Sequence, residues 1–245
     1  MENEYQAKKI RKLARQKLNE KWLRAALVFL VPGLLVFMGI VVSSVTVTAS
    51  ILTGKSGIPF SIFLIFTLIE LATGLILAGL NLALLDYYRG DSGFLKAFTS
   101  FKYTKNYFVP IVKVWFVTCI LLWLWSLLLF IPGLIKGYSY SQTLYIYFDH
   151  LKKGQQVKVI NCITESRKLM DGHKMNLFIL QLSFIGWMLL AGLTRGIGYL
   201  WLEPYMAIAV IAFYTILIKD NEPERPANVE NPHSEGPDHI AVAEN

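Results

Sequence analysis

A single acidic residue, Glu70, stands in the middle of a long apolar run of this chain. It lies ten residues into Phe60–Leu85 and is flanked by Leu68, Ile69 and Leu71. If that run crosses a bilayer, a charged carboxylate at this depth costs about 3 kcal/mol unless it is paired or protonated. Glu70 is therefore either a proton or cation site, or a neutral carboxylic acid that hydrogen-bonds to a neighbouring helix.

Uncharged polar side chains form a second group of candidate site residues, in the segment Leu134–Phe148. The members that share one face of a helix by their spacing are Tyr138, Ser141, Gln142 and Tyr145. Hydroxyl and amide groups suit hydrogen bonds to a polar ligand or a lipid headgroup. They suit bonds between helices equally well, and both interpretations stay open.

Two opposite charges, Lys136 and Glu203, form a candidate pair. Both lie a few residues inside the predicted outer ends of apolar segments. If the two segments pack together the charges can meet, which lowers the cost of placing each of them in lipid. A structural salt bridge is the favoured interpretation, and a ligand site is the alternative.

Motifs for catalysis are absent from the sequence. It contains no Gly-rich phosphate loop, no His-Glu zinc helix, no nucleophile elbow and no CxxC pair. Asp149-His150 and Asp171-Gly172-His173 are interpreted as connection residues rather than as acid–base pairs. We predict no catalytic residue, no metal site and no cofactor, and a protein that is not an enzyme.

The elements that must position these residues are long apolar runs. Apolar residues make up 54% of the chain and charged residues only 17%, which is unlike an ordinary soluble domain. A helix needs about 20 residues to cross a bilayer. The runs near or above this length are Ala25–Val47, Phe60–Leu85, Phe108–Ile131, Leu177–Leu193 and Tyr199–Ile218. The sequence predicts an all-α, polytopic membrane protein.

The positions of Lys and Arg predict how the chain is threaded. Eight basic residues precede the first run, four lie in 86–107, six lie in 149–176 and two follow residue 218. Basic residues concentrate on the cytoplasmic side, so both termini are predicted to be cytoplasmic, in the plasma membrane. This alternation requires Leu134–Phe148 to cross as well. We therefore predict a six-span membrane domain over residues 25–218. The net charge of +7 reflects this topology, and no nucleic-acid partner is expected.

The chain also repeats a pattern in which a short basic, amphipathic segment precedes two spans. These segments are Tyr5–Glu20, Ser92–Lys102 and Gln156–Met170. They divide the chain into three helical-hairpin units, at about 1–88, 89–150 and 151–218. The first segment, within cytoplasmic residues 1–24, places Ile10, Leu13, Ala14, Leu18 and Trp22 on one helical face. Such helices are predicted to be interfacial, with basic residues toward anionic lipid, or else to be solvated charged helices.

Composition changes sharply after residue 218. Residues 219–245 hold seven acidic residues, two basic residues and four prolines. A segment of this kind cannot bury enough apolar surface to fold. We predict a disordered, acidic cytoplasmic tail.

Several motifs occur in a fixed order along the chain: Arg89-Gly90-Asp91, Leu129–Ser141, Gly172-His173-Lys174, Leu182–Trp187 and Pro204-Tyr205. In these motifs the chain resembles the bacterial integral membrane family catalogued as domain of unknown function 975. The resemblance covers most of residues 1–218 and implies a multi-pass plasma-membrane protein. It implies no activity. Glu70 and Glu203 do not match positions of the family pattern.

Two functional hypotheses follow from these features. A non-catalytic accessory or scaffold protein, with an unknown protein partner, agrees with the amphipathic segments, the tail and the lack of catalytic motifs. A small carrier for a lipid or polar solute, proton-coupled through Glu70, agrees with the repeats and with the polar segment Leu134–Phe148. We favour the accessory protein and keep the carrier as the alternative.

Overall fold

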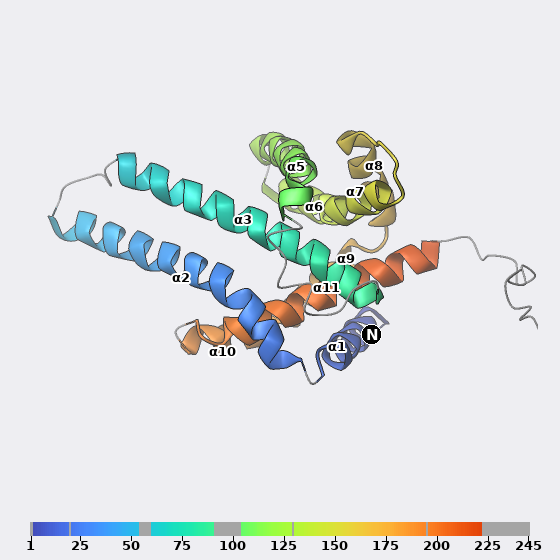
Figure 1. Ribbon diagram of the computed structural model, residues 1–245, viewed down its shortest axis with the longest axis horizontal. Helices are drawn as coiled ribbons and strands as arrows, with labels where there is room; N and C mark the ends of the chain where they lie inside the picture. Colours follow the sequence, from blue (N-terminus) through green and yellow to red (C-terminus); the bar gives the residue numbers. More distant parts are fainter. Residues whose placement is uncertain are drawn as a thin grey trace, which may run out of the picture.

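The part of the chain that the structure describes is helical and contains no β-strand. The computed structural model describes residues 2–19, 21–53, 60–90, 104–128, 130–194 and 196–221 (Figure 1). The helices in chain order are α1 (Glu2–Leu18), α2 (Trp22–Thr53), α3 (Phe60–Arg89), α5 (Phe108–Leu128), α6 (Phe130–Tyr140), α7 (Thr143–Lys152), α8 (Val159–Leu169), α9 (Lys174–Leu182), α10 (Ile185–Leu193) and α11 (Tyr199–Asn221). The all-α prediction is confirmed for these residues. The second amphipathic segment, Ser92–Lys102, and the tail beyond Asn221 lie outside them.

Five stretches of the described residues are long and apolar enough to cross a membrane. They are Trp22–Leu52, Leu64–Arg89, Phe108–Leu127, Lys174–Leu193 and Tyr199–Asn221. Each overlaps one of the five apolar runs, so the prediction of these five is confirmed. The fourth stretch consists of α9 and α10, which meet at the turn Ser183-Phe184.

The sixth predicted span does not form one continuous helix. Residues 134–148 are divided between α6, which ends at Tyr140, and α7, which begins at Thr143. At the break, Ser141 Oγ donates to the carbonyl of Tyr138, and Thr143 Oγ1 donates to that of Tyr140. Such local hydroxyl bonds compete with the helical ladder. The structure thus replaces the predicted span with two helices of 11 and 10 residues, each too short to cross alone.

Helices α2 and α3 form a long antiparallel hairpin whose tip extends beyond the other helices (Figure 1). Helix α2 has 32 residues and is about 48 Å long at 1.5 Å per residue. It bends in its first half (Figure 1), which contains Pro32. A proline inside a helix removes one ladder hydrogen bond and favours such a bend.

Helix α1 packs against α9 and α11 through its apolar face. Ala7, Ile10, Ala14 and Leu18 are all less than 5% exposed. The predicted apolar face therefore exists, but other helices of the same chain cover it. Its residues are buried against protein because α9 and α11 pack along this face. This corrects the expectation that the apolar face of this segment lies in the lipid headgroup layer.

The core of the molecule lies around α11 and the second half of α3. Ile208, Ala209, Ile211, Ala212 and Tyr214 of α11 are completely buried. Large apolar side chains elsewhere stay exposed, especially along α2, α5 and α10. Soluble proteins rarely expose contiguous apolar surface on this scale. The pattern is compatible with helices that contact lipid.

Candidate functional site

Opposite charges meet where α3 and α7 end. Arg89, the last residue of α3, donates from Nη1 to Oδ1 and from Nη2 to Oδ2 of Asp149 on α7, the second at 2.8 Å. Tyr214 of α11 donates its hydroxyl proton to Asp149 Oδ2, also at 2.8 Å. The side chains of Arg89 and Asp149 are 24% and 16% exposed. This shielded bidentate pair, with its hydroxyl, ties three helices together.

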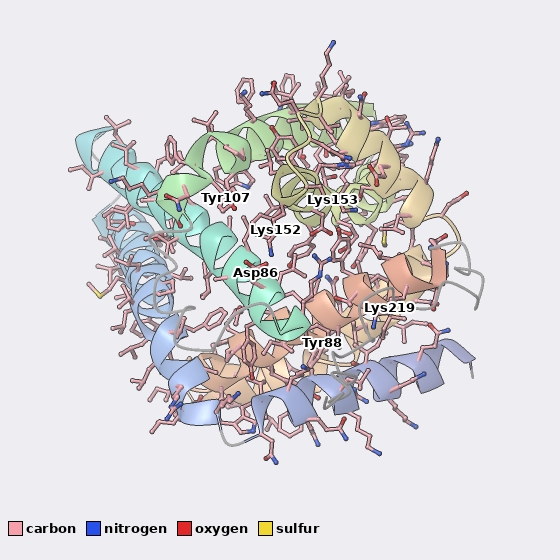
Figure 2. All side chains as sticks on the ribbon, turned by 45° about the vertical axis from the view of Figure 1, so that its right-hand side comes forward. Asp86, Tyr88, Tyr107, Lys152, Lys153 and Lys219 are labelled. Atoms are coloured by element: carbon pink, nitrogen blue, oxygen red, sulfur yellow. The ribbon has the colours of Figure 1, made fainter. Side chains whose placement is uncertain are left out.

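A second ion pair lies beside the first. Lys152 of α7 donates from Nζ to Asp86 Oδ1 of α3 at 2.8 Å, and the Asp86 side chain is only 7% exposed. Figure 2 shows the two side chains pointing toward each other between these helices. We call Asp86, Arg89, Asp149, Lys152 and Tyr214 the charged cluster.

Tyr87, the residue after Asp86, connects α3 to the turn between α1 and α2. Tyr87 donates from its hydroxyl to the carbonyl of Lys17 at 2.9 Å, and Lys21 Nζ donates to that hydroxyl at 3.1 Å. The Lys21 ammonium also lies 4.9 Å from the centre of the Tyr87 ring. The last turn of α3 therefore contacts α7, α11 and the end of α1.

The charged cluster is suited to holding helices rather than to proton transfer. Each carboxylate in it faces a cation, and a buried charge is tolerated when it is paired and hydrogen-bonded. A general base needs an open lone pair toward a substrate, whereas both oxygens of Asp149 already accept hydrogen bonds. Among the described residues, no group of three or more His, Cys, Asp or Glu is placed to hold a metal ion.

His150 lies next to the cluster, with both ring nitrogens engaged. Nε2 is 2.8 Å from Glu165 Oε2, and Nδ1 is 2.6 Å from Gln155 Oε1. The hydrogen bond with Glu165 raises the pKa of His150 above its ordinary value. Two acceptors facing one imidazole favour the protonated ring, which has two N–H donors.

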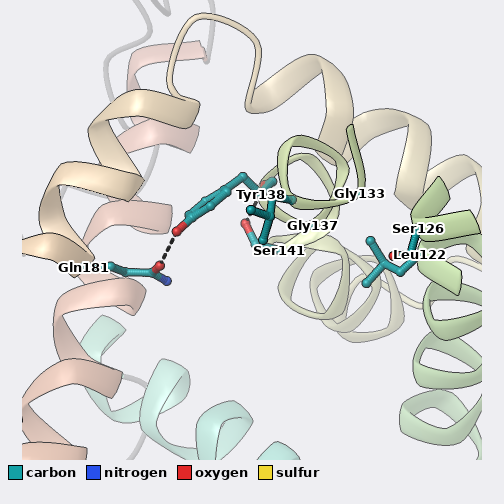
Figure 3. A pocket seen from close by; sticks show the side chains of 8 residues that line it. Leu122, Ser126, Gly133, Gly137, Tyr138, Ser141 and Gln181 are labelled. Carbon is teal, nitrogen blue, oxygen red and sulfur yellow. Dashed lines mark hydrogen bonds between the residues drawn. The ribbon is translucent and has the colours of Figure 1, made fainter. Parts of the chain in front are cut away.

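A mainly apolar groove with polar groups at one end opens between α5, α6 and α9 (Figure 3), and we call it the polar groove after those groups. It has a volume of about 350 Å³. Tyr138 of α6 and Gln181 of α9 lie at one end, where the tyrosine hydroxyl donates to Gln181 Oε1 at 2.8 Å. Leu122 and Ser126 of α5 contribute the opposite wall.

Two glycines of α6 shape this polar groove. A Cβ atom at Gly133 would come within 2.9 Å of Ser126 Oγ and 3.4 Å of Ser126 Cα, so the glycine lets α6 approach α5 closely. One turn later, a Cβ atom at Gly137 would meet only Leu122 Cδ2, at 3.9 Å. A larger side chain at Gly137 would thus enter space that the groove now occupies.

The four polar residues predicted to share a face are separated by the break after Tyr140. Tyr138 and Ser141 line the polar groove. Gln142 is completely buried; its Nε2 donates to Ser141 Oγ at 2.9 Å, and its Oε1 has no hydrogen-bond partner among the described residues. Tyr145 is 6% exposed, and its ring centre lies 5.1 Å from that of Tyr214. The structure therefore brings two of the four to the groove and places Tyr145 against the charged cluster.

Glu70 lies where α3 contacts α2. Its Oε1 atom occupies the space that a Cβ atom at Gly39 would need. The side chain is otherwise exposed on the hairpin. The glycine of α2 thus provides room for the carboxyl group of α3.

Lys136 and Glu203 do not form the predicted pair. Lys136 Nζ lies 4.4 Å above the ring centre of Trp125 on α5. Glu203, in the first turns of α11, is exposed and has no ion pair in the part of the chain described by the structure. Lys136 therefore contacts an aromatic ring of the neighbouring helix α5 instead of the expected carboxylate.

The charged cluster was not anticipated from the sequence. Its four charged residues follow two of the predicted spans, Phe60–Leu85 and Leu134–Phe148, where the sequence analysis treated them as connection residues. A signal was nevertheless present, because Asp86 and Arg89 repeat the order and spacing of Asp149 and Lys152. Two acid–x–x–base pairs of this kind can pair reciprocally, and the structure pairs them that way.

Comparison of the sequence with known protein families finds a match. Residues 76–221 match the model of a family described as "Protein of unknown function (DUF975)". The matched region is more than half of the chain, and it contains the charged cluster and the polar groove but not Glu70. No curated protein and no solved structure matches the chain.

Proposed function

We propose that this chain, which belongs to the DUF975 family of proteins of unknown function, is a non-catalytic accessory protein of the plasma membrane. In this proposal its helices form a platform at the inner surface of the membrane. The basic side of α1 faces anionic lipid there, together with an acidic surface of a protein partner. No nucleic-acid partner is involved. The proposal rests on the surface of α1.

Helix α1 has one side fixed on protein and the other side exposed. Its apolar residues pack on α9 and α11. Its exposed polar side chains are Lys8, Lys9, Lys12, Arg15, Gln16 and Lys17. Because the helix is held by its buried face, these charges stand at fixed positions. Fixed positive charge attracts anionic lipid and acidic protein surfaces.

The charged cluster supports the same proposal. It uses its ionic groups to hold α3, α7 and α11 together, so they stabilise the platform rather than act on a substrate. Hydrolytic or transfer activity of the purified protein that disappears on changing a single polar residue would contradict a non-catalytic role.

The threading that we propose has six crossings and cytoplasmic termini. Helices α6 and α7 together form one broken crossing, which keeps the basic connection 149–176 on the inner side with α1. Two observations support three hairpin units. The acid–x–x–base sequence is repeated at the ends of α3 and α7. A short helix precedes two spans both in residues 2–89 and in residues 159–221. Labelling of single cysteines at Gly154 and Lys55 from each side of the membrane tests this: access to both from the same side would overturn it.

The accessory role is tested by reversing two exposed charges of α1. Lys9→Glu with Lys12→Glu reverses two of the five positive charges of this side, and Lys9→Arg with Lys12→Arg keeps all five. The protein is cross-linked in cells and extracted gently from its own membrane, and the mass of the intact complex is measured by native mass spectrometry. We expect a partner at fixed stoichiometry with the wild type and the arginine variant, and its loss with the glutamate variant. A wild-type protein without any partner would contradict the proposal.

A carrier is the second candidate function, because the polar groove provides a place for a ligand. Proton coupling through Glu70 distinguishes it from the accessory role. Glu70→Gln keeps the size of the side chain that packs at Gly39 but cannot titrate. A proton-coupled carrier would lose its phenotype with folding intact, whereas an accessory protein would be unaffected.

A further inference from the structure

The polar groove combines an apolar wall with hydrogen-bonding atoms that are not saturated. Tyr138 uses its hydroxyl proton on Gln181 Oε1, which leaves the hydroxyl oxygen of Tyr138 as an acceptor. The amide nitrogen of Gln181 has no partner in the part of the chain described by the structure and can donate. One donor and one acceptor therefore stand side by side at the end of the groove (Figure 3).

The surroundings of the groove indicate which molecules reach it. Helices α5 and α9 belong to two of the stretches that are long and apolar enough to cross a membrane. Leu134, which lines the groove, is 50% exposed. A groove that opens between such helices inside a bilayer faces acyl chains rather than water. Its volume of about 350 Å³ falls in the range of ligand sites, which is about 300–1,000 Å³.

The charge of the lining restricts the ligand further. No ionisable acid or base lines the groove apart from the Tyr138 phenol, so a phosphate drawn into it would lack a cation. Burying an unpaired charge at membrane depth is costly. A hydroxyl group, in contrast, can donate to Tyr138 Oη and accept from Gln181 Nε2 at once. The groove therefore suits a neutral amphiphile.

We propose that the polar groove binds a neutral glycerolipid with a free hydroxyl group, such as a diacylglycerol. An acyl chain lies against Leu122 in the space left open by Gly137, and the hydroxyl group lies between Tyr138 and Gln181. This inference requires the helices to be in a membrane but does not depend on the accessory role. The α1 variants and the groove variants test the two separately.

The test measures lipid capture by the purified full-length protein in nanodiscs. The probes are a photoactivatable diacylglycerol and a phosphatidylglycerol with the same acyl chains. Gly137→Leu fills the groove. Gly186→Leu is the matched control, because a Cβ atom at Gly186 meets nothing within 4 Å. Tyr138→Phe and Gln181→Leu remove the hydrogen-bonding atoms singly, and thermal unfolding verifies that each variant is folded.

We expect diacylglycerol to be captured by the wild type and by Gly186→Leu. Capture should fall at least about tenfold in Gly137→Leu and about three- to tenfold in each hydrogen-bond variant. Equal capture by a folded Gly137→Leu, or equal labelling by phosphatidylglycerol that Tyr138→Phe does not change, would overturn the proposal. If Gly137→Leu does not fold, the test relies on Tyr138→Phe and Gln181→Leu. Unchanged capture of diacylglycerol by both of these variants would reject the site.

Discussion

The charged cluster and the polar groove both place polar side chains beside apolar helices, but they use them differently. In the cluster, Asp149 accepts hydrogen bonds from Arg89 and Tyr214, and Asp86 faces Lys152. In the groove, the pair Tyr138–Gln181 leaves a donor and an acceptor open toward a cavity. The cluster joins α3, α7 and α11 through its bonds, while the groove between α5, α6 and α9 leaves room for a ligand.

The difference shows how a role can be assigned to a polar group that lies between apolar helices. A fully partnered network rigidifies a fold, whereas a partly partnered one at a cavity can bind a ligand. The distinction depends on the partners of each atom and not on the residue types. Substitutions in the cluster should therefore change stability, and substitutions in the groove should change binding while stability stays nearly constant.

The largest effect is expected from Asp149→Ala. It leaves Arg89 without its carboxylate and Tyr214 without its acceptor. Removing one partner of a buried pair costs about 3–5 kcal/mol. Since both charged side chains retain some exposure, we expect about 3 kcal/mol, measured as a loss of thermal stability in detergent.

The control for this prediction is Asp171→Ala. Asp171 also pairs with a lysine, Lys174 at 3.4 Å, but its side chain is 82% exposed. Exposed pairs contribute about 0–1 kcal/mol, so this variant should be close to the wild type. If both variants lose the same stability, the charged cluster has no special structural role.

Much of this fold follows from patterns that the sequence carries locally. Apolar runs of about 20 residues predict the five long stretches because hydrocarbon thickness sets their length. The spacing of Ile10, Ala14 and Leu18 predicts the buried face of α1, and all three are buried. The covering of this face by α9 and α11 could not be predicted, because helical spacing identifies a face and not its partner.

The site was harder to predict, since it depends on residues that are distant along the chain. Arg89 and Asp149 are 60 residues apart, and charge counting assigned both to connections. The break at Ser141-Gln142 was missed for a local reason. Hydroxyl groups that bond to the preceding turn compete with the helix, and their effect depends on small energy differences that composition does not reveal.

The same substitution in the two regions should give different results. Tyr214→Phe removes a hydrogen bond to a carboxylate from a completely buried side chain, and we expect a loss of about 1.5–2 kcal/mol in unfolding free energy. Tyr138→Phe removes a bond between neutral groups at the groove and should cost about 0.5–1 kcal/mol. Thermal unfolding of both variants in one detergent compares them directly. A larger loss for Tyr138→Phe would reverse the roles that we assign to the two regions.

A smaller effect is expected for the ion pair between Asp86 and Lys152. A double-mutant cycle with Asp86→Asn and Lys152→Met isolates their interaction from other changes. Because Lys152 is 33% exposed, solvent screens the pair, and we expect a coupling of about 1 kcal/mol that weakens with added salt. A coupling near zero would leave Arg89–Asp149 as the only ion pair of the charged cluster that contributes.

The smallest effect concerns pH and His150, at the edge of the charged cluster. Hydrogen bonding to Glu165, with a further contribution from Gln155, raises the pKa of His150, while partial burial and, to a smaller extent, Lys153 oppose the shift. A group whose pKa is higher in the folded state stabilises the fold below its unfolded pKa, which is about 6.5 for histidine. This contribution disappears as pH rises through the folded value. The stability advantage of the wild type over His150→Gln should therefore shrink as pH rises above about 6.5. In a Glu165→Gln background, which removes the main cause of the shift, the same comparison should be nearly independent of pH. An advantage that grows with pH would mean that His150 is neutral in the folded protein and that Glu165 does not hold its proton.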